Sequence, residues 1–346
     1  MADEVLTYAS SGVDIDAAER ALRGVLPSIK ATYNDQVVSG VGGFGGLFRA
    51  SFPGMERPVL VSSIDGVGTK TKVAAMVGKF DGLGADIVNH CINDILCQGA
   101  RPLFFMDYYG TSRLTADVFE AVVGSAALAC KESGVVLLGG ETAEMPGVYH
   151  DEEVDIVGSI VGVVDMDKKL PKPSVGVGDA LVGIASDGLH TNGFSLARRA
   201  LFEVGGMSVR DLVPGLERTV GEELLRPHRC YFNPLWPIIE EGGVVKAIAH
   251  ITGGGLYDNL PRVLSNDVAA QIERRSWTPL PIFDLIQKAG NVPDVEMFRT
   301  FNMGIGLVVV CDRDHAPALV QLLNQAGEAA AVIGELQRGS CEVNIV

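Results

Sequence analysis

Several short segments of the sequence combine residue types that suit the binding of a phosphorylated ligand. The first is S-S-I-D-G-V-G-T-K, residues 62–70, which follows the apolar run P-V-L-V. Asp65 would stand at the carboxyl end of a strand, where open α/β sheets usually bind ligands. Gly66 and Gly68 would let the backbone approach a phosphate closely, and Lys70 could meet its charge. Taken alone, the segment is better explained as a turn with a solvated lysine.

A polar stripe is predicted on the next helix, residues 84–97. Asp86, His90 and Asp94 recur at four-residue spacing and therefore share one face, which two asparagines flank. Such a face is usually solvated. This one lacks lysine, glutamate and arginine, however, and its short oxygen donors suit a hard cation such as Mg²⁺.

A third segment, G-G-E-T-A-E-M-P-G at residues 139–147, also follows a predicted strand. Glu141 comes directly after two glycines, so we expect it at a tight turn with little around it. Glu144 is the less favoured acid, because it lies closer to Pro146. We expect three metal ligands from separate elements to converge on phosphate-bound Mg²⁺, namely Asp65, Asp94 and Glu141.

A glycine-rich segment precedes all of these. Five glycines within S-G-V-G-G-F-G-G-L-F, residues 39–48, could form a backbone cradle for phosphates. The segment matches neither the dinucleotide-binding nor the P-loop pattern. A mobile N-terminal flap is the plainer interpretation, and it is compatible with the cradle.

The second half of the chain offers two polar turns, S-D-G-L-H-T-N-G and H-I-T-G-G-G-L. They contain His190, Asn192 and His250, and Thr252 stands before the glycine triplet. Glycines that open a helix make a good anion site. A lone histidine is more often structural than catalytic, but both of these lie beside glycine-rich turns after strands.

The overall composition indicates a loop-rich α/β protein, with 47% hydrophobic residues and 42 glycines. The net charge of −15 disfavours nucleic acid and anionic lipid as partners. The six cysteines are scattered without a C-x-x-C pair, which fits a reducing compartment. With no signal-type start and no membrane-length apolar run, we expect a cytoplasmic protein.

Alternating strands and helices suggest two α/β domains. The segment 166–179 holds two prolines, two glycines and three lysines and is the best boundary, which divides the chain into residues 1–168 and 169–346. The predicted strands are 58–64, 103–109, 135–138, 154–164, 180–185, 247–251, 306–311 and 331–336. The predicted helices are 84–97, 115–132, 194–204, 281–289 and 316–326.

Taken together, the motifs resemble one family. They are G-V-D-I-D-A (12–17), G-V-G-G-F-G-G-L-F (40–48), D-G-V-G-T-K (65–70), D-x-x-x-x-G-A-x-P (94–102), G-G-E-T-A-E-M-P-G-V-Y (139–149), H-x-T-G-G-G (250–255) and R-T-F-N-M-G-I-G (299–306). In their residues and in their order they are similar to the motifs of the phosphoribosylformylglycinamidine cyclo-ligase family, over nearly the whole chain. The resemblance implies an enzyme that uses ATP and Mg²⁺ to close the imidazole ring of formylglycinamidine ribonucleotide, giving aminoimidazole ribonucleotide in purine biosynthesis.

The resemblance also assigns roles to residues. For metal-bound nucleotide it implies Asp65, Asp94 and Glu141, with Thr69 also in the nucleotide site. For the phosphates it implies Gly42, Gly43, Gly45 and Gly46, together with Lys70. For substrate binding and proton transfer it implies His190, Asn192, His250, Thr252, Gly253 and Gly254, with Asp94, Lys70, His190 and His250 as the catalytic set. The implied fold is an N-terminal α/β domain that forms a β-barrel across a homodimer interface, beside a larger C-terminal α/β domain.

Other members of the superfamily fit less well. Selenophosphate synthetase carries a reactive Cys or selenocysteine near its N-terminal loop, where residues 1–50 here have no Cys. The hydrogenase-maturation dehydratase ends in Cys, whereas this chain ends in Val346. Thiamine-monophosphate kinase tends to have an acid where His250 stands, and formylglycinamidine ribonucleotide synthetase depends on a glutaminase partner. A non-catalytic nucleotide-binding regulator on the same fold remains the alternative from another class.

Overall fold

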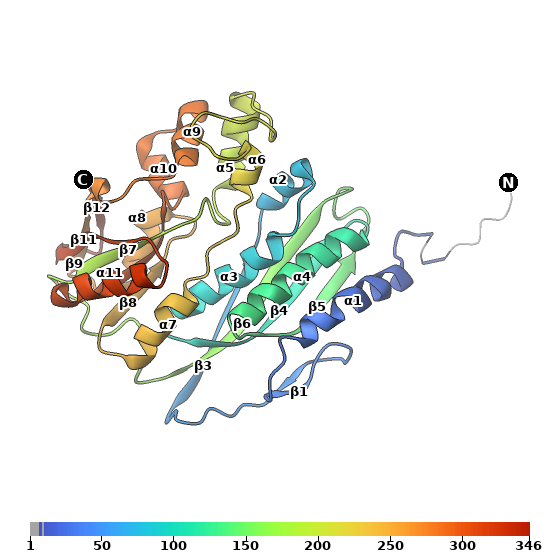
Figure 1. Ribbon diagram of the computed structural model, residues 1–346, viewed down its shortest axis with the longest axis horizontal. Coiled ribbons are helices and arrows are strands. Elements are labelled where there is room, and N and C mark those ends of the chain that lie inside the picture. The colour runs from blue at the N-terminus through green and yellow to red at the C-terminus, as the bar shows by residue number, and fades with distance from the viewer. Residues whose placement is uncertain (1–6, 9) are drawn as a thin grey trace.

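The computed structural model describes residues 7, 8 and 10–346 and shows two α/β halves packed side by side (Figure 1). The first residues, in which the sequence shows no signal-type pattern, lie largely outside this part of the chain. Within it, no helix combines the length and the apolar character needed to cross a membrane.

The N-terminal half is built around a four-stranded sheet with the order β3-β6-β4-β5, in which only β4 and β5 run parallel. Its strands are β3 (Pro58–Gly66), β4 (Arg101–Thr111), β5 (Val136–Glu144) and β6 (Val154–Asp165). A short pair, β1 (Val37–Ser39) and β2 (Leu47–Phe48), precedes it. Burial alternates along β3, and Leu60 and Ile64 are 61% and 69% exposed. One face of this sheet is therefore bare.

Helices cover the other face of the N-terminal sheet. They are α1 (Ile15–Lys30), α3 (Leu83–Leu96) and α4 (Ala116–Glu132). The shorter α2 (Lys70–Val77) packs against α6 (Val220–Leu224) of the other half. The apolar stripe of α3 packs on β3, β4 and β6, while α4 packs beside it and against β5. The predicted helix 115–132 is confirmed as α4, and Gly134, with a φ of +66°, follows its end.

The C-terminal half holds a six-stranded sheet with the order β12-β9-β11-β7-β10-β8. Its strands are β7 (Ala180–Ala185), β8 (Val245–His250), β9 (Val268–Ile272), β10 (Ile305–Cys311), β11 (Ala330–Arg338) and β12 (Val343–Ile345). Its helical segments are α5 (Phe194–Arg198), η1 (Arg199–Val204), α6 (Val220–Leu224), α7 (Phe232–Glu241), α8 (Gly255–Asn259), η2 (Leu260–Val263), η3 (Arg274–Ser276), α9 (Pro281–Gly290), α10 (Asp294–Thr300), η4 (Arg313–His315) and α11 (Ala316–Gln325). Every residue of β10 is buried, so both faces of this sheet are covered at its centre.

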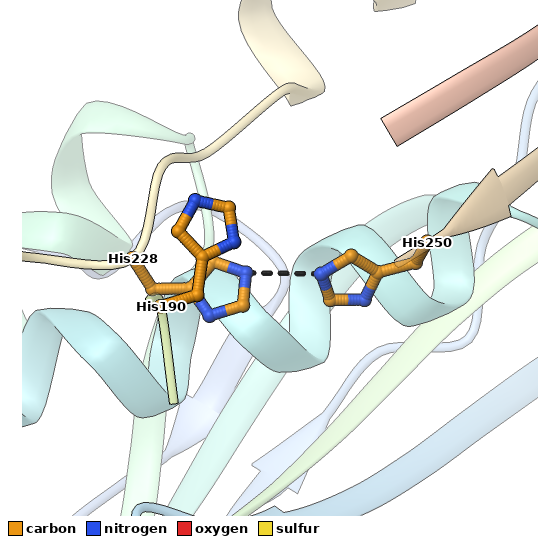
Figure 2. Close-up of side chains that lie close together, drawn as sticks. All are labelled: His190, His228 and His250. Atoms are coloured by element: carbon orange, nitrogen blue, oxygen red, sulfur yellow. Dashed lines mark hydrogen bonds between the residues drawn. The ribbon is translucent and has the colours of Figure 1, made fainter. Parts of the chain in front are cut away.

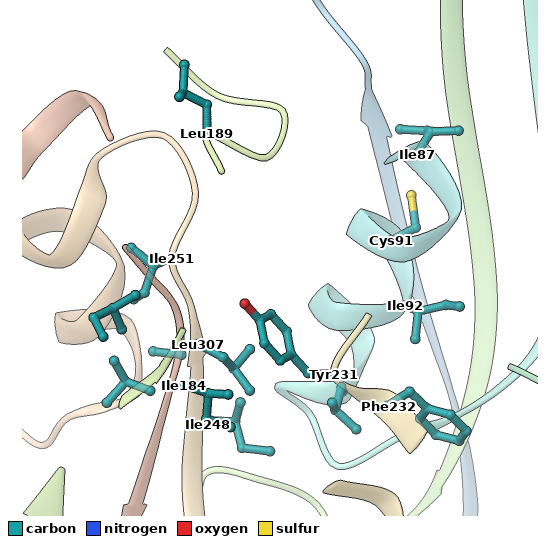
Figure 3. Close-up of a cluster of buried hydrophobic side chains, with 14 of the residues drawn as sticks. Ile87, Cys91, Ile92, Ile184, Leu189, Tyr231, Phe232, Ile248, Ile251 and Leu307 are labelled. Atoms are coloured by element: carbon teal, nitrogen blue, oxygen red, sulfur yellow. The ribbon is translucent and has the colours of Figure 1, made fainter. Parts of the chain in front are cut away.

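One apolar core continues from α3 into the C-terminal sheet (Figure 3). Tyr231 spans the junction: its N–H donates to Asn93 Oδ1 at 3.0 Å, and its hydroxyl donates to the Ala185 carbonyl at 2.8 Å. The predicted mixed α/β architecture is thus confirmed. The two halves share a buried seam, and α3 forms the N-terminal side of it.

Candidate active site

The polar face of α3 is buried, not solvated. Asp86 and Asn93 are 0% exposed and His90 is 1% exposed. The segment 226–231 lies against this face, where Asn89 Nδ2 donates to the His228 carbonyl at 2.7 Å. Solvation, the usual meaning of such a stripe, is therefore wrong here, because these side chains satisfy backbone groups of the C-terminal half.

Asp65 and Asp94 meet at His90. The His90 Nε2 atom lies 2.9 Å from Asp65 Oδ2 and 3.8 Å from Asp94 Oδ2. The Ser63 hydroxyl donates to that same Asp94 oxygen at 2.9 Å. Two of the three acids predicted to bind metal are thus held around one imidazole, one from the end of β3 and one from α3.

Further histidines extend this cluster into the C-terminal half (Figure 2). His250, the last residue of β8, has Nδ1 at 2.8 Å from Asp94 Oδ1 and Nε2 at 2.9 Å from Nε2 of His228. The Thr191 hydroxyl lies 3.2 Å from His228 Nδ1 and 2.7 Å from His90 Nδ1. Hydrogen bonds therefore link the two carboxylates by a continuous buried path.

His190 packs on this path without joining it. Its ring stacks on that of His228 with centroids 4.0 Å apart, and neither of its buried ring nitrogens has a hydrogen-bond partner among the described residues. Nitrogens of His190, His228 and His250 come within 4.8 Å of one another. Because the lone pairs of two stacked rings lie in separate planes, they do not point to one common metal position.

The pKa shifts favour the charged form of the acids and the neutral form of the interior histidines. Burial opposes ionisation of Asp65 and Asp94, but hydrogen bonds from His90 and His250 hold the pKa of each carboxyl below its ordinary value. Burial also opposes the charging of His90, yet its two carboxylate neighbours raise its pKa. The cluster therefore keeps both acids ionised at neutral pH.

The remaining imidazoles favour the neutral form. Burial, followed by repulsion from nearby cationic groups, sets the pKa of His190 and of His228 well below its ordinary value. Burial also lowers the pKa of His250, although Asp94 opposes this. A neutral His250 has one ring N–H, and Asp94 is the acceptor that fixes it on Nδ1.

A cleft of about 630 Å³ opens between the two halves, and Asp94 and His250 face it. One wall comes from β3 and the end of α3, and the other from β8, Thr252 and η2. The pair therefore lies where a ligand can touch both halves at once.

Lys70 does not reach this cleft. Its side chain is fully buried, and its ammonium donates to Asp86 Oδ1 at 2.8 Å, to the Arg226 carbonyl at 2.7 Å and to the His190 carbonyl at 3.1 Å. Three acceptors use all three N–H donors of a lysine. Burial lowers the pKa of Lys70 against the attraction of Asp86. In this arrangement Lys70 ties the two halves together, and protein acceptors occupy its three donors.

Glu141 lies apart from the other two acids. The preceding strand, expected to be short, continues to Glu144, so Glu141 is an exposed strand residue and the predicted tight turn is wrong. Paired positions across the sheet form a row of Asp65, Gly158, Asp107 and Gly140. Three strand intervals, roughly 14 Å, therefore separate Asp65 from the neighbour of Glu141. Glu144 accepts hydrogen bonds from the N–H groups of Leu114 and Asp14.

The glycine-rich segment between β1 and β2 is exposed. It contains the four glycines predicted to touch phosphates, Gly42, Gly43, Gly45 and Gly46. Gly42 has a φ of +110°, and Phe44 is fully exposed at 117% of its reference area. Thr69, at the start of α2, has its hydroxyl 3.1 Å from Ser195 Oγ of the other half.

The residues predicted for the substrate side lie together. A Cβ on Gly253 would come within 3.5 Å of Asn192 Nδ2, and Thr252 lines the cleft. Gly254 has a φ of +98° and precedes α8, which has only 5 residues. The expected helix after the glycine triplet is therefore present but short.

Three residues of this region were missed from sequence, namely Thr191, His228 and Arg262. His228 lies on an irregular segment with no periodic pattern around it. Thr191 stands between His190 and Asn192, which are both predicted on the substrate side. Its position between them is the sequence signal that points to it.

Models of known families match both halves of the chain. The N-terminal domain of AIR synthase related protein matches residues 52–164, and its C-terminal domain matches residues 176–345. Fold and site together define a two-domain protein of the AIR synthase related class.

Curated relatives narrow this class. The phosphoribosylformylglycinamidine cyclo-ligase of Alkaliphilus metalliredigens is 45% identical over 343 residues, which cover 99% of each chain. The protein of the same name from Brevibacillus brevis is 46% identical over 336 residues, covering 97% of each. The chain belongs to the phosphoribosylformylglycinamidine cyclo-ligase family.

Solved structures share the fold at low sequence identity. Thiamine-monophosphate kinase from Stenotrophomonas maltophilia gives a TM-score of 0.67 at 17% identity, covering 93% of this chain and 95% of that one. The hydrogenase maturation protein HypE in complex with ATP gives 0.63 at 18% identity, covering 97% and 93%. At these identities the likeness concerns the fold alone.

Proposed function

We propose that the chain catalyses ATP-dependent ring closure in purine biosynthesis. Formylglycinamidine ribonucleotide and ATP would give aminoimidazole ribonucleotide, ADP and phosphate. The observation that carries this proposal is the Asp94–His250 pair, 2.8 Å apart, on the wall of a cleft of about 630 Å³ between the two halves. That volume lies in the range of small-molecule sites. The identity of the reaction is inferred from the names of the relatives.

The chemistry needs positioned groups and no covalent nucleophile. Phosphoryl transfer from ATP to the formyl amide oxygen gives an iminophosphate, in which a poor leaving group has become a good one. The amidine nitrogen then attacks that carbon, the C–O bond breaks, phosphate leaves, and the nitrogen loses a proton. Asp94 and His250 would hold and orient the reacting amide. Lys70 and His190 would act indirectly, by fixing the segments that carry this pair.

A magnesium ion fits the carboxylates of the cluster. The Asp65 and Asp94 side chains are 41% and 28% exposed, and each has an oxygen within 3.8 Å of the same His90 nitrogen. Both pKa values are held low, by hydrogen bonds that outweigh burial, so both acids offer the charged oxygens that Mg²⁺ prefers. When bound, the ion would neutralise charge on the triphosphate.

Glu141 would join this site from a second copy of the chain. Within one chain it is on the opposite edge strand from Asp65, and the sheet face between them is bare and partly apolar. We propose a homodimer in which two such sheets close into a barrel, which sets Glu141 of the partner subunit beside β3. The division into residues 1–168 and 169–346, the glycine-rich phosphate contacts and a cytoplasmic location also stay predictions.

Mixed dimers test the shared site. Asp65→Asn and Glu141→Gln should each be nearly inactive alone. In a refolded equimolar mixture half of the dimers pair the two variants, and each of these has one intact site, so we expect about a quarter of wild-type activity. An inactive mixture that still contains dimers would place Glu141 in the site of its own chain. Wild-type activity of Glu141→Gln alone would place Glu141 outside the site.

The proposed reaction is tested by turnover. The protein is incubated with formylglycinamidine ribonucleotide, ATP and Mg²⁺, and aminoimidazole ribonucleotide and ADP are measured. Equal amounts of both products support the enzyme. Protection of the fold by ATP without any product would favour the nucleotide-binding regulator.

A further inference from the structure

Arg262 is a cation without a partner on the wall of the cleft. It belongs to η2, is exposed, and makes no ion pair or hydrogen bond with any residue that the structure describes. It is the one lysine or arginine among the residues that line the cleft. In a chain with a net charge of −15, an arginine that faces a cleft and forms no ion pair is a candidate anion ligand.

The other polar side chains of the cleft are mostly occupied by internal bonds. Each of four donates to an acceptor within the protein, namely Ser62, Ser63, Thr252 and Asn259. Gln98, at the end of α3 on the opposite wall, is exposed and shows no side-chain hydrogen bond among the described residues. Arg262 and Gln98 are therefore the free N–H donors of the cleft.

The two donors come from the two halves of the chain. Gln98 follows α3 on one wall of the cleft, and Arg262 belongs to η2 on the other wall. A fork of N–H donors suits a phosphate, which it can bind at two oxygens.

We propose that Arg262, assisted by Gln98, binds the 5′-phosphate of the ribonucleotide substrate, an inference that rests on the proposed function. The triphosphate of ATP is the other source of phosphate in this reaction. We assign it to the acids and their metal ion, since Asp94 and Asp65 would bind it through a cation. A monophosphate without a metal needs a cationic side chain, and Arg262 supplies it.

Calorimetry tests this on the full-length protein. Wild type should bind formylglycinamidine ribonucleotide about 10- to 100-fold more tightly than the corresponding riboside, which lacks the phosphate. Arg262→Gln should lose most of this preference without changing affinity for the riboside. Arg262→Lys should retain part of it, because lysine keeps the charge but not the fork. Arg275→Gln, at an exposed arginine of η3 outside the cleft, is the matched control and should behave as wild type.

The outcomes are distinct. An unchanged preference in Arg262→Gln, or a rise in the KM for ATP alone, would overturn the assignment of the 5′-phosphate. Wild-type turnover with that result would leave the proposed function intact. Absence of turnover in wild type, with the phosphate preference still dependent on Arg262, would overturn the proposed reaction but support the phosphate site.

Discussion

The two sheets differ in how completely one chain covers them. All residues of β10 and nearly all of β7 are buried, and neither strand carries a charged residue. In the N-terminal sheet alternate residues of β3 are exposed from Pro58 to Ile64, and Asp65 is the penultimate residue of the strand. The centre of the C-terminal sheet is thus covered on both faces within one chain. The N-terminal sheet leaves one face exposed, which a ligand or a second copy could cover.

This difference divides the chemistry between the halves. In the proposed site the N-terminal half supplies the carboxylates, Asp65 and Asp94. The C-terminal half supplies His250, at the end of the buried strand β8, and Arg262 beyond it. A site at the seam needs the two halves held in a fixed relative position. The buried contacts of Lys70 hold them there.

The largest expected effect comes from removing the buried contacts of Lys70, which hold the two halves together. Lys70→Met leaves Asp86 buried without its cation and should lower the free energy of unfolding by about 3 to 5 kcal/mol, measured by urea denaturation. Lys72→Met is the matched control two residues away, where a partly exposed lysine pairs with Glu153 and its loss should cost under about 1 kcal/mol. Equal effects for the two variants would contradict the role given to Lys70.

Asp94→Asn should separate chemistry from folding. The amide keeps the shape of the side chain but lacks its charge, so turnover should fall by about 100-fold or more. The unfolding midpoint should fall modestly, because His250 and Ser63 lose a charged acceptor. Asp117→Asn, at an exposed position in the first turn of α4, should leave the rate unchanged. A wild-type rate for Asp94→Asn would remove this acid from the site.

Asp107 belongs to β4 of the N-terminal sheet and lies on the same face as the buried Phe105 and Tyr109. It therefore distinguishes this covered face from the exposed one. Burial raises its pKa from 3.8 to about 7. Between about pH 4 and 7 the folded state therefore holds a proton that the unfolded state has released, so stability falls as pH rises through this window. Asp107→Asn should be more stable than wild type by about 2 to 3 kcal/mol at pH 6.

The pH dependence of that difference is the critical readout. Urea denaturation at a series of pH values should show the advantage of Asp107→Asn shrinking toward zero below pH 4. A constant difference across the series would show that the carboxyl does not titrate as proposed.

The smallest effect concerns the bare face of the N-terminal sheet. Ile64→Ala removes apolar area from both copies of the proposed dimer and should raise its dissociation constant about 10-fold or more. Val332→Ala, at a residue of β11 that is 44% exposed, is the control on the C-terminal sheet. Light scattering distinguishes the 36.6 kDa chain from a dimer of twice that mass. A wild-type protein that is monomeric and fully active would contradict the proposed barrel.

Sequence predicted the elements whose pattern is local. The apolar period of α3 and the β-branched runs of β3 and β10 follow directly from residue order, and so does the position of Asp65 at a strand end. The burial of the polar stripe on α3 does not, because it depends on the distant segment 226–231. For the same reason Lys70 was expected at a phosphate and His228 was missed. Both are explained only by contacts between the two halves.

The most direct measurement follows the formyl oxygen of the substrate. Formylglycinamidine ribonucleotide labelled with ¹⁸O at the formyl group is converted with ATP, and the products are analysed by mass spectrometry. If the amide oxygen is phosphorylated before ring closure, each turnover delivers one ¹⁸O atom into inorganic phosphate. Unlabelled phosphate, with the ¹⁸O recovered in water, would contradict the account.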